Sequence, residues 1–286
     1  MKLQNDCFPC LARNAVDFAG RITDDPAVQR KILRETMHLI ADLDFDKCTP
    51  PHVAPLITQA ALKAAGAPPD TDLFLEDKER STAMAKALVA QLPRIAAYNG
   101  DDFKSRLLLA ASGNLIDFGI YSDLNLDNAS RLITRALETE VDVAAVARLK
   151  ERMDKAERIL YLLDNCGEAV FDGIFMEPYK EKITLAVRGQ NIYNDVTREY
   201  LGPSGLLELG CPVIDNGTPY PGTILDEVTP EFLKAFRAAD LIIAKGQGNF
   251  ETLYGEDAPI AFIFMAKCPV VSALLGVPRN TIQILA

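Results

Sequence analysis

The spacing of apolar residues changes character a little past the middle of the 286-residue chain. From residue 7 to about residue 155, apolar side chains recur three and four positions apart, as in segments 31–43 and 82–97. This spacing is typical of amphipathic helices. Asp25-Pro26 suits a helix start, because aspartate caps the free N–H groups and proline fits the first helical position. The sequence up to residue 155 is therefore predicted to be helical.

After residue 155, short apolar runs alternate with helical stretches. Runs that are apolar at nearly every position are typical of parallel strands whose two faces are both covered. The expected strands are 159–163, 183–187, 212–214, 241–244 and 260–264. The expected helices between them are 168–175, 195–200 and 230–238. This order predicts an α/β fold, with a helical N-terminal region over residues 1–155 and an α/β domain over residues 156–286.

Composition narrows the class of protein. Hydrophobic residues make up 49% of the chain, enough for a substantial core, and 30 basic against 40 acidic residues give a net charge of −10. Without a long basic run, binding to the nucleic-acid backbone is disfavoured, although a metal ion can still attract a small anionic molecule. The chain has neither a long apolar run nor an apolar signal core near Met1. We expect a cytoplasmic protein with no membrane or nucleic-acid partner.

Polar residues follow the first expected strand at the point where it meets the next helix. Asp164 and Asn165 come directly after an apolar run that ends at Leu163. Ligands bind at these strand ends in open α/β sheets, and carboxylate and amide oxygens are the donors that Mg²⁺ or Mn²⁺ prefers. The alternative is that Asp164 only caps the following helix.

The second expected strand leads to another acidic residue, Asp195. Two carboxylates from neighbouring strand ends could converge on one cation, whereas a single acid at such a place is usually a cap. The alternative is that Asn194 or Asp195 caps a helix that starts at Val196.

The strand expected at 241–244 runs into Lys245, Gly246 and Gly248. Lysine offers a compact charge for a phosphoryl oxygen, and glycine lets backbone N–H groups approach it. The spacing is not that of the phosphate loop of nucleotide hydrolases. In the helical region, Asn114 and Asp117 are three residues apart and could share a helix face, unless Asn114 is an ordinary cap.

The N-terminal cysteines, Cys7 and Cys10, are spaced to bind one soft metal or to form a redox pair. A closed zinc site needs four ligands, and Cys48, His38 and His52 are the only further candidates in that region. The alternative is a plain pair of buried thiols. With only two histidines in the chain, a histidine nucleophile is disfavoured.

Four motifs follow one another over nearly the whole chain: Gly113-Asn114-x-x-Asp117, Asp164-Asn165-x-Gly167-Glu168-x-x-x-Asp172, Asn194-Asp195-Val196-Thr197 and Lys245-Gly246-x-Gly248-Asn249. Together they resemble the motifs of the damage-control phosphatases, a family also described as acidic-residue methyltransferase-like. The cysteine pair resembles the branch of this family found in archaea and bacteria.

The resemblance implies a three-layer α/β/α, Rossmann-like sheet and a phosphatase that depends on Mn²⁺, Co²⁺, Ni²⁺ or Mg²⁺. Its substrates would be small phosphorylated metabolites, damaged by-products among them, such as sugar or cofactor phosphates. Residue by residue, the metal ligands fall on Asp164, Asn165 and Asp195, and the phosphate-contacting lysine on Lys245. Catalysis would then rest on Asp164, Asp195 and Lys245. The remaining substrate-binding positions are Asn114, Asp117 and Gly246.

Several alternatives stay open at this level. The attacking group is either Asp164, through a phospho-aspartyl intermediate, or a metal-bound water. A carboxyl methyltransferase on the same fold, or a non-catalytic sensor of metal or phosphometabolite, would use the same pocket. Substrate identity, the preferred metal and the oligomeric state are not determined by the sequence.

Overall fold

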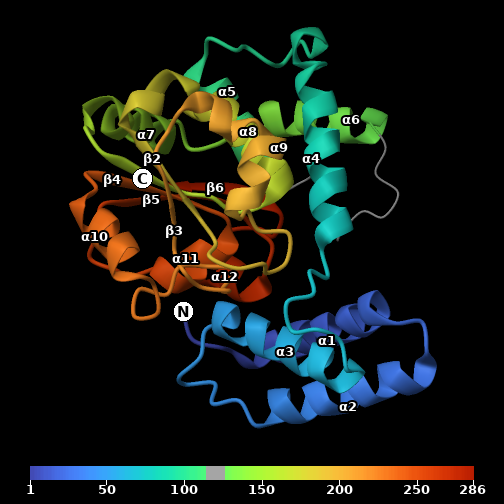
Figure 1. The fold of residues 1–286 in the computed structure, drawn as a ribbon. Coiled ribbons are helices and arrows are strands. Elements are labelled where there is room, and N and C mark those ends of the chain that lie inside the picture. The colour runs from blue at the N-terminus through green and yellow to red at the C-terminus, as the bar shows by residue number, and fades with distance from the viewer. Residues whose placement is uncertain (114–125) are drawn as a thin grey trace.

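A six-stranded sheet forms the centre of the fold in the computed structural model, which describes residues 1–113 and 126–286. Its strands lie in the order β3-β2-β1-β4-β5-β6, and all are parallel except β6, which runs antiparallel to β5. Figure 1 shows the sheet among the helices that surround it. The α/β fold expected from the sequence is therefore confirmed. The strands are β1 Ile159–Leu162, β2 Ile183–Val187, β3 Val213–Asp215, β4 Leu241–Lys245, β5 Ile260–Ala266 and β6 Thr281–Leu285.

The order of connection reverses at the two central strands. The chain moves outward from β1 to β2 and β3, then returns to β4 beside β1 and moves outward the other way. In doubly wound sheets of this order, ligands bind beyond the carboxyl ends of the strands at the point of reversal. Here that point lies between the residues that follow β1 and those that follow β4.

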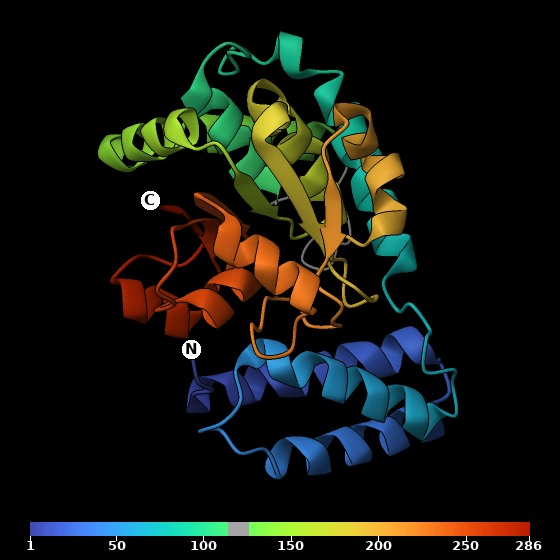
Figure 2. The ribbon, with the colours of Figure 1, turned by 60° about the vertical axis from the view of Figure 1, so that its left-hand side comes forward.

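Helices cover both faces of the sheet, so the three-layer arrangement is confirmed (Figure 2). Side chains alternate along each strand: Tyr161 and Ile243 pack with α5, α7 and α8, whereas Leu160 and Ile242 pack with α10, α11 and α12. Helices α4 and α6 pack outside α5 and α8. The bounds are α4 Leu75–Val89, α5 Phe103–Ser112, α6 Leu126–Leu137, α7 Val143–Lys155, α8 Cys166–Met176, α10 Pro230–Ala238, α11 Gln247–Leu253 and α12 Pro269–Leu275.

The first three helices form a bundle with a hydrophobic core of its own, seen in blue in Figure 2. They are α1 Phe8–Ile22, α2 Pro26–Ala41 and α3 Pro50–Ala65. The helix start expected at Asp25 is confirmed, because its Oδ1 accepts a hydrogen bond from the Ala27 N–H at 2.8 Å. Among the helices of the described residues, none has both the length and the apolar character needed to cross a membrane.

Two local expectations were wrong or incomplete. The helix expected at 195–200 is absent, because the segment around Val196 pairs with the strand end at Asp164, and only η5 Arg198–Tyr200 and α9 Leu201–Ser204 follow. Strand β6 and helices α11 and α12 were not anticipated. The remaining short helices are η1 Asn5–Cys7, η2 Leu92–Arg94, η4 Glu177–Lys182 and η6 Leu206–Leu209.

Candidate active site

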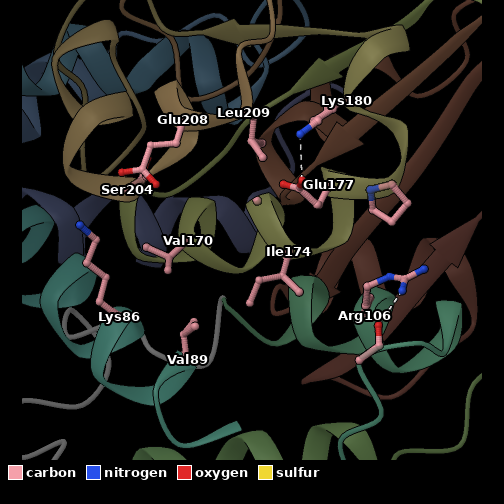
Figure 3. Close-up of a pocket in the computed structure, with 14 residues that line it drawn as sticks. Lys86, Val89, Arg106, Val170, Ile174, Glu177, Lys180, Ser204, Glu208 and Leu209 are labelled. Atoms are coloured by element: carbon pink, nitrogen blue, oxygen red, sulfur yellow. Dashed lines mark hydrogen bonds and ion pairs between the residues drawn. The ribbon is translucent and has the colours of Figure 1, made fainter. Parts of the chain in front are cut away.

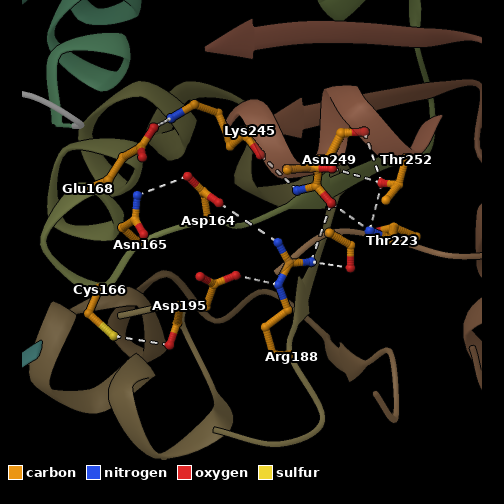
Figure 4. A network of polar contacts seen from close by, with 12 residues as sticks. Asp164, Asn165, Cys166, Glu168, Arg188, Asp195, Thr223, Lys245, Asn249 and Thr252 are labelled. Atoms are coloured by element: carbon orange, nitrogen blue, oxygen red, sulfur yellow. Dashed lines mark hydrogen bonds and ion pairs between the residues drawn. The ribbon is translucent and has the colours of Figure 1, made fainter. Parts of the chain in front are cut away.

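The fold brings three of the expected site residues together beyond the ends of β1 and β2. Asp164 and Asn165 follow β1 directly, and the segment after β2 turns back so that Asp195 forms an isolated β-bridge with Asn165. The Val196 N–H donates to the carbonyl oxygen of Asp164 at 2.8 Å. The two carboxylates consequently face the same small region, as Figure 4 shows.

Arg188 lies between these carboxylates, and the sequence analysis had not assigned it a role (Figure 4). Its Nε donates to Asp195 Oδ2 at 2.7 Å, and its Nη2 lies 3.8 Å from Asp164 Oδ1. Its Nη1 donates to the Gly222 carbonyl at 3.2 Å and to Asn249 Oδ1 at 3.3 Å. The side chain is 3% exposed, so the guanidinium holds Asp195 from within the protein.

The electrostatic environment of Asp164 disfavours its ionised form. Burial raises the pKa of Asp164 well above its ordinary value, and the neighbouring charges of Asp195 and Glu168 raise it further, while Arg188 opposes them. Two adjacent carboxylates disfavour each other's ionisation, and the charges of Arg188 and Lys267 only partly compensate here.

The buried charges around the site do not balance. Among the buried groups, four carboxylates face two cations, which leaves an excess of two negative charges when all six are ionised. The six residues are Asp164, Glu168, Asp172 and Asp195 with Arg188 and Lys245. The half-buried Lys267 offsets part of this excess, since its charge lowers the pKa of Asp164 and of Glu168. A divalent cation would offset the rest, and the oxygens of Asp164, Asn165 and Asp195 are of the kind that hard cations prefer.

The donor set fits such an ion only with the asparagine included. Among residues 1–113 and 126–286, no group of three or more His, Cys, Asp and Glu side chains is arranged to hold a metal. Two carboxylates and one amide are thus what the described residues offer. Asn114 and Asp117, the other expected residues of the cleft, lie outside the described residues.

Lys245 is the centre of a buried ionic cluster rather than an exposed group. Its Nζ donates to the Ala110 carbonyl at 3.1 Å, to Asp172 Oδ1 at 2.6 Å and to Glu168 Oε1. Burial alone would lower the pKa of Lys245, but Asp172 and Glu168 outweigh it and raise the pKa. All three protons of the ammonium group have acceptors, so contact with a phosphoryl oxygen requires that one of them be released.

The two acids of this cluster come from helix α8. Burial raises the pKa of Glu168 to about 7, with Lys245 acting against the increase. Asp172 also accepts a hydrogen bond from the Tyr161 hydroxyl at 2.7 Å. The sequence motif had included both acids without a role, and the structure pairs them with the lysine expected to bind phosphate.

Gly246 lies against the carboxyl group of Asp164. Its φ is +81°, and a Cβ atom added there would lie 2.1 Å from both Cγ and Oδ2 of Asp164. Its N–H donates to the Ile263 carbonyl at 3.1 Å and so already has a partner. Gly246 therefore provides space for the Asp164 carboxylate, and the phosphate contact expected of it stays a prediction.

A cavity of about 670 Å³ lies away from these residues (Figure 3). Helices α4 and α8 line it together with η4 and η6, and none of the strand-end carboxylates reaches it. Three of its charged groups have partners: Lys180 pairs with Glu177 at 2.9 Å, and Arg106 donates to the Gly100 carbonyl at 2.6 Å. The buried carboxylates are thus at the sheet reversal and not here.

The two N-terminal cysteines lie in different surroundings. Cys7 is buried, Cys10 is exposed, and both are free thiols, as is Cys48. Burial raises the pKa of Cys7, which disfavours its free thiolate. His52 is used in the cap of α3, beside Thr49. Because Cys10 is exposed, the two cysteines are not a pair of buried thiols, and the metal or redox role stays a prediction.

Comparisons with known proteins cover nearly the whole chain. A model of the damage-control phosphatase ARMT1-like domain matches residues 3–282. Damage-control phosphatase PH1575 of Pyrococcus horikoshii is 34% identical, over 99% of this chain and 97% of its own, and a damage-control phosphatase of Archaeoglobus fulgidus is 29% identical, over 97% and 96%.

A solved structure agrees with the sequence relatives. The crystal structure of a P. horikoshii protein described as a DUF89 family protein superposes with a TM-score of 0.88 at 34% identity. The match covers 100% of this chain and 99% of that one. By sequence and by fold, the chain belongs to the damage-control phosphatase ARMT1-like family.

Proposed function

We propose that the protein is a divalent-metal-dependent phosphatase that hydrolyses phosphate monoesters of small metabolites, such as sugar or cofactor phosphates. The observation that carries the metal dependence is the excess of two buried negative charges at the sheet reversal, where Asp164 and Asp195 crowd around one arginine. The relatives named as damage-control phosphatases support the reaction class.

Different residues of the site have different roles in the proposed reaction. Asp164, Asn165 and Asp195 would hold the cation, which, when bound, draws negative charge from the phosphoryl oxygens. Arg188 fixes the direction of Asp195 through the 2.7 Å bond from its Nε. Catalysis in phosphoryl transfer is mostly positioning and electrostatics, and this holds whether Asp164 or a water molecule attacks.

The test is release of inorganic phosphate by the purified protein from para-nitrophenyl phosphate and a panel of sugar, cofactor and nucleotide phosphates. We expect turnover with at least one of Mn²⁺, Co²⁺, Ni²⁺ and Mg²⁺, and its loss when EDTA is added. Turnover that persists in EDTA contradicts the metal dependence. Stabilisation by ligand without turnover indicates a sensor, and binding of adenosylmethionine indicates a methyltransferase.

Gly246→Ala is expected to lower phosphatase kcat/KM by roughly 10²-fold, because its Cβ would displace the Asp164 carboxylate and misplacements of about 1 Å cost that much. Gly255→Ala is the matched control. Gly255 has a similar φ of +94°, but nothing lies within 4 Å of its added Cβ. Backbone strain alone would therefore affect both variants. Equal activity in the two, measured with para-nitrophenyl phosphate at saturating metal, would show that the space beside Asp164 is unimportant.

A further inference from the structure

Asp195 belongs to a segment, residues 188–197, that leaves the sheet and comes back to it. Both ends of the segment are held near the sheet: the Arg188 N–H donates to the Val196 carbonyl at 2.9 Å, and the Val196 N–H donates to Asp164 at 2.8 Å. Apart from an isolated bridge at each of Arg188, Asp195 and Thr197, the segment has no helix or strand of its own. Further bonds hold Gly189, whose N–H donates to the Thr218 carbonyl at 3.2 Å, and Asn194, whose carbonyl accepts from the Cys166 N–H at 2.9 Å. Residues 190–193 are therefore the part that contacts beyond the sheet must fix.

Tyr193 anchors the middle of this segment in the N-terminal bundle. Its ring lies 6.0 Å from that of Phe18 and 5.5 Å from that of Phe74, the second in an edge-to-face arrangement. The Asn14 amide donates to the Tyr193 hydroxyl at 3.3 Å. Such aromatic pairs add about 0.5–1.5 kcal/mol each beyond the area that they bury.

The backbone at Tyr193 is strained. Its φ is +43°, and among the described residues only one other non-glycine residue has a positive φ. A non-glycine residue in this region costs on the order of 1–3 kcal/mol and persists only where its surroundings over-determine it. Asp195 is two residues further along the chain. The backbone conformation of Tyr193 therefore helps to set the direction in which the Asp195 carboxylate points.

A buried lysine ties the same segment to the helices at a second point. Lys78, in α4, is fully buried, and its Nζ donates to Asn191 Oδ1 and to Asp72 Oδ2, both at 2.8 Å. A buried ammonium group whose partners are side chains on two different segments links those segments with a defined geometry. The segment that carries Asp195 is thus fixed by α1, by α4 and by the stretch between α3 and α4.

We propose that Tyr193 is a positioning residue for the metal site, through which the N-terminal bundle sets the place of the Asp195 carboxylate. The inference rests on the proposed function, since it concerns the same site. It assigns to the bundle a role in catalysis: the bundle supplies an outer support of a cation ligand, in addition to the bonds that join residues 194–196 to residues 164–166. Displacement of one reacting or binding group by about 1 Å costs roughly 10²-fold in rate.

The experiment compares two cavity variants of one hydrophobic core. Tyr193→Ala removes the anchor, whereas Ile32→Ala empties space in α2 of the same bundle core, at a residue that is 0% exposed. Both are expected to lower the unfolding temperature. Only Tyr193→Ala is expected to weaken Mn²⁺ binding, by about 10-fold or more, and to lower kcat. Tyr193→Phe, which keeps the ring, should bind Mn²⁺ within about threefold of the parent protein.

A second readout does not depend on metal. Hydrogen exchange at the amides of Asp195 and Val196 reports on the segment directly, because these groups donate to Ile192 and Asp164. We expect at least about 10-fold faster exchange there in Tyr193→Ala and no change in Ile32→Ala. Unchanged exchange in Tyr193→Ala, or equal loss of Mn²⁺ affinity in both alanine variants, overturns the proposal. A parent protein that binds no metal refutes the proposed function instead, and the exchange result still decides the role of Tyr193.

Discussion

Replacement of Asp164 by asparagine is expected to lower phosphatase kcat/KM by roughly 10²–10³-fold while leaving the metal-free protein at least as stable as the parent. Activity falls because a charged ligand of the cation becomes a neutral one of the same shape. Stability does not fall because the ionised carboxylate is unfavourable where it lies: burial, together with Asp195 and Glu168, raises the pKa of Asp164 well above its ordinary value. Asparagine imitates the protonated form.

The dependence on pH follows from the same shift. When the folded-state pKa of a carboxyl group is raised, the folded protein binds its proton more tightly than the unfolded chain. Its contribution to stability is therefore complete below the unfolded pKa and is lost as the pH rises through the folded value. The metal-free parent protein should lose stability as the pH rises through the folded-state pKa of Asp164. The Asp164→Asn variant should lose less stability over the same pH range.

Thermal unfolding with and without Mn²⁺ checks both statements. The metal should raise the unfolding temperature of the parent protein, because it binds the folded chain selectively, and should raise that of Asp164→Asn much less. Asp154→Asn serves as the control, since Asp154 is an exposed residue paired with Lys150 at 2.6 Å. If the Asp164→Asn variant keeps the activity of the parent protein and the same response to Mn²⁺, Asp164 is not a ligand of the metal.

Lys245→Met is expected to lower the free energy of unfolding by about 3–5 kcal/mol. Methionine preserves much of the volume but leaves Glu168 and Asp172 buried without the ammonium group that now lies between them. Lys63→Met, a change of the same kind at an exposed position in α3, should alter stability by less than about 0.5 kcal/mol. Denaturant unfolding at neutral pH measures the two changes side by side.

A triple variant separates the structural and catalytic roles of the lysine. Lys245→Met combined with Glu168→Gln and Asp172→Asn has no charge left in the cluster, so much of the lost stability should return. Phosphatase activity should stay low if Lys245 also contacts the phosphoryl group, as the sequence predicts. Recovery of both stability and activity would leave Lys245 with a structural role alone. A single variant as stable as the parent protein would contradict the charge-balance argument.

The strands of the parallel sheet could be predicted because burial on both faces leaves a simple record in the sequence. In β1, β2 and β4 nearly every side chain is buried, so the chain there is a continuous apolar run. Strand β6 lies at the edge, where Thr281 and Gln283 are only half-buried, and five residues of mixed character carry no such record. The expected helix at 195–200 failed because Asp195 and Val196 pair with a partner about 30 positions earlier, which local pattern does not reveal.

Part of the candidate site could likewise be predicted from the sequence, and part could not. Asp164, Asn165 and Asp195 could be proposed because each follows an expected strand, and strand ends meet at one edge. Arg188 follows a buried strand as well, but its partners come from three other segments. Likewise, Lys245 could be recognised as a functional type of residue, whereas its engagement by α8 depends on how that helix crosses the sheet.

The ionic cluster of Lys245 also has a consequence for synthesis of the chain. Its acidic members precede the lysine by 77 and 73 residues, so ribosomes that add about 5–20 residues per second make them roughly 4–15 s earlier. During that interval, burial of α8 against the growing sheet would enclose two acids with no counter-charge. We therefore expect the half of the sheet that is made first to stay incomplete until β4 is synthesised, because β4 gives β1 its second neighbour and α8 its cation.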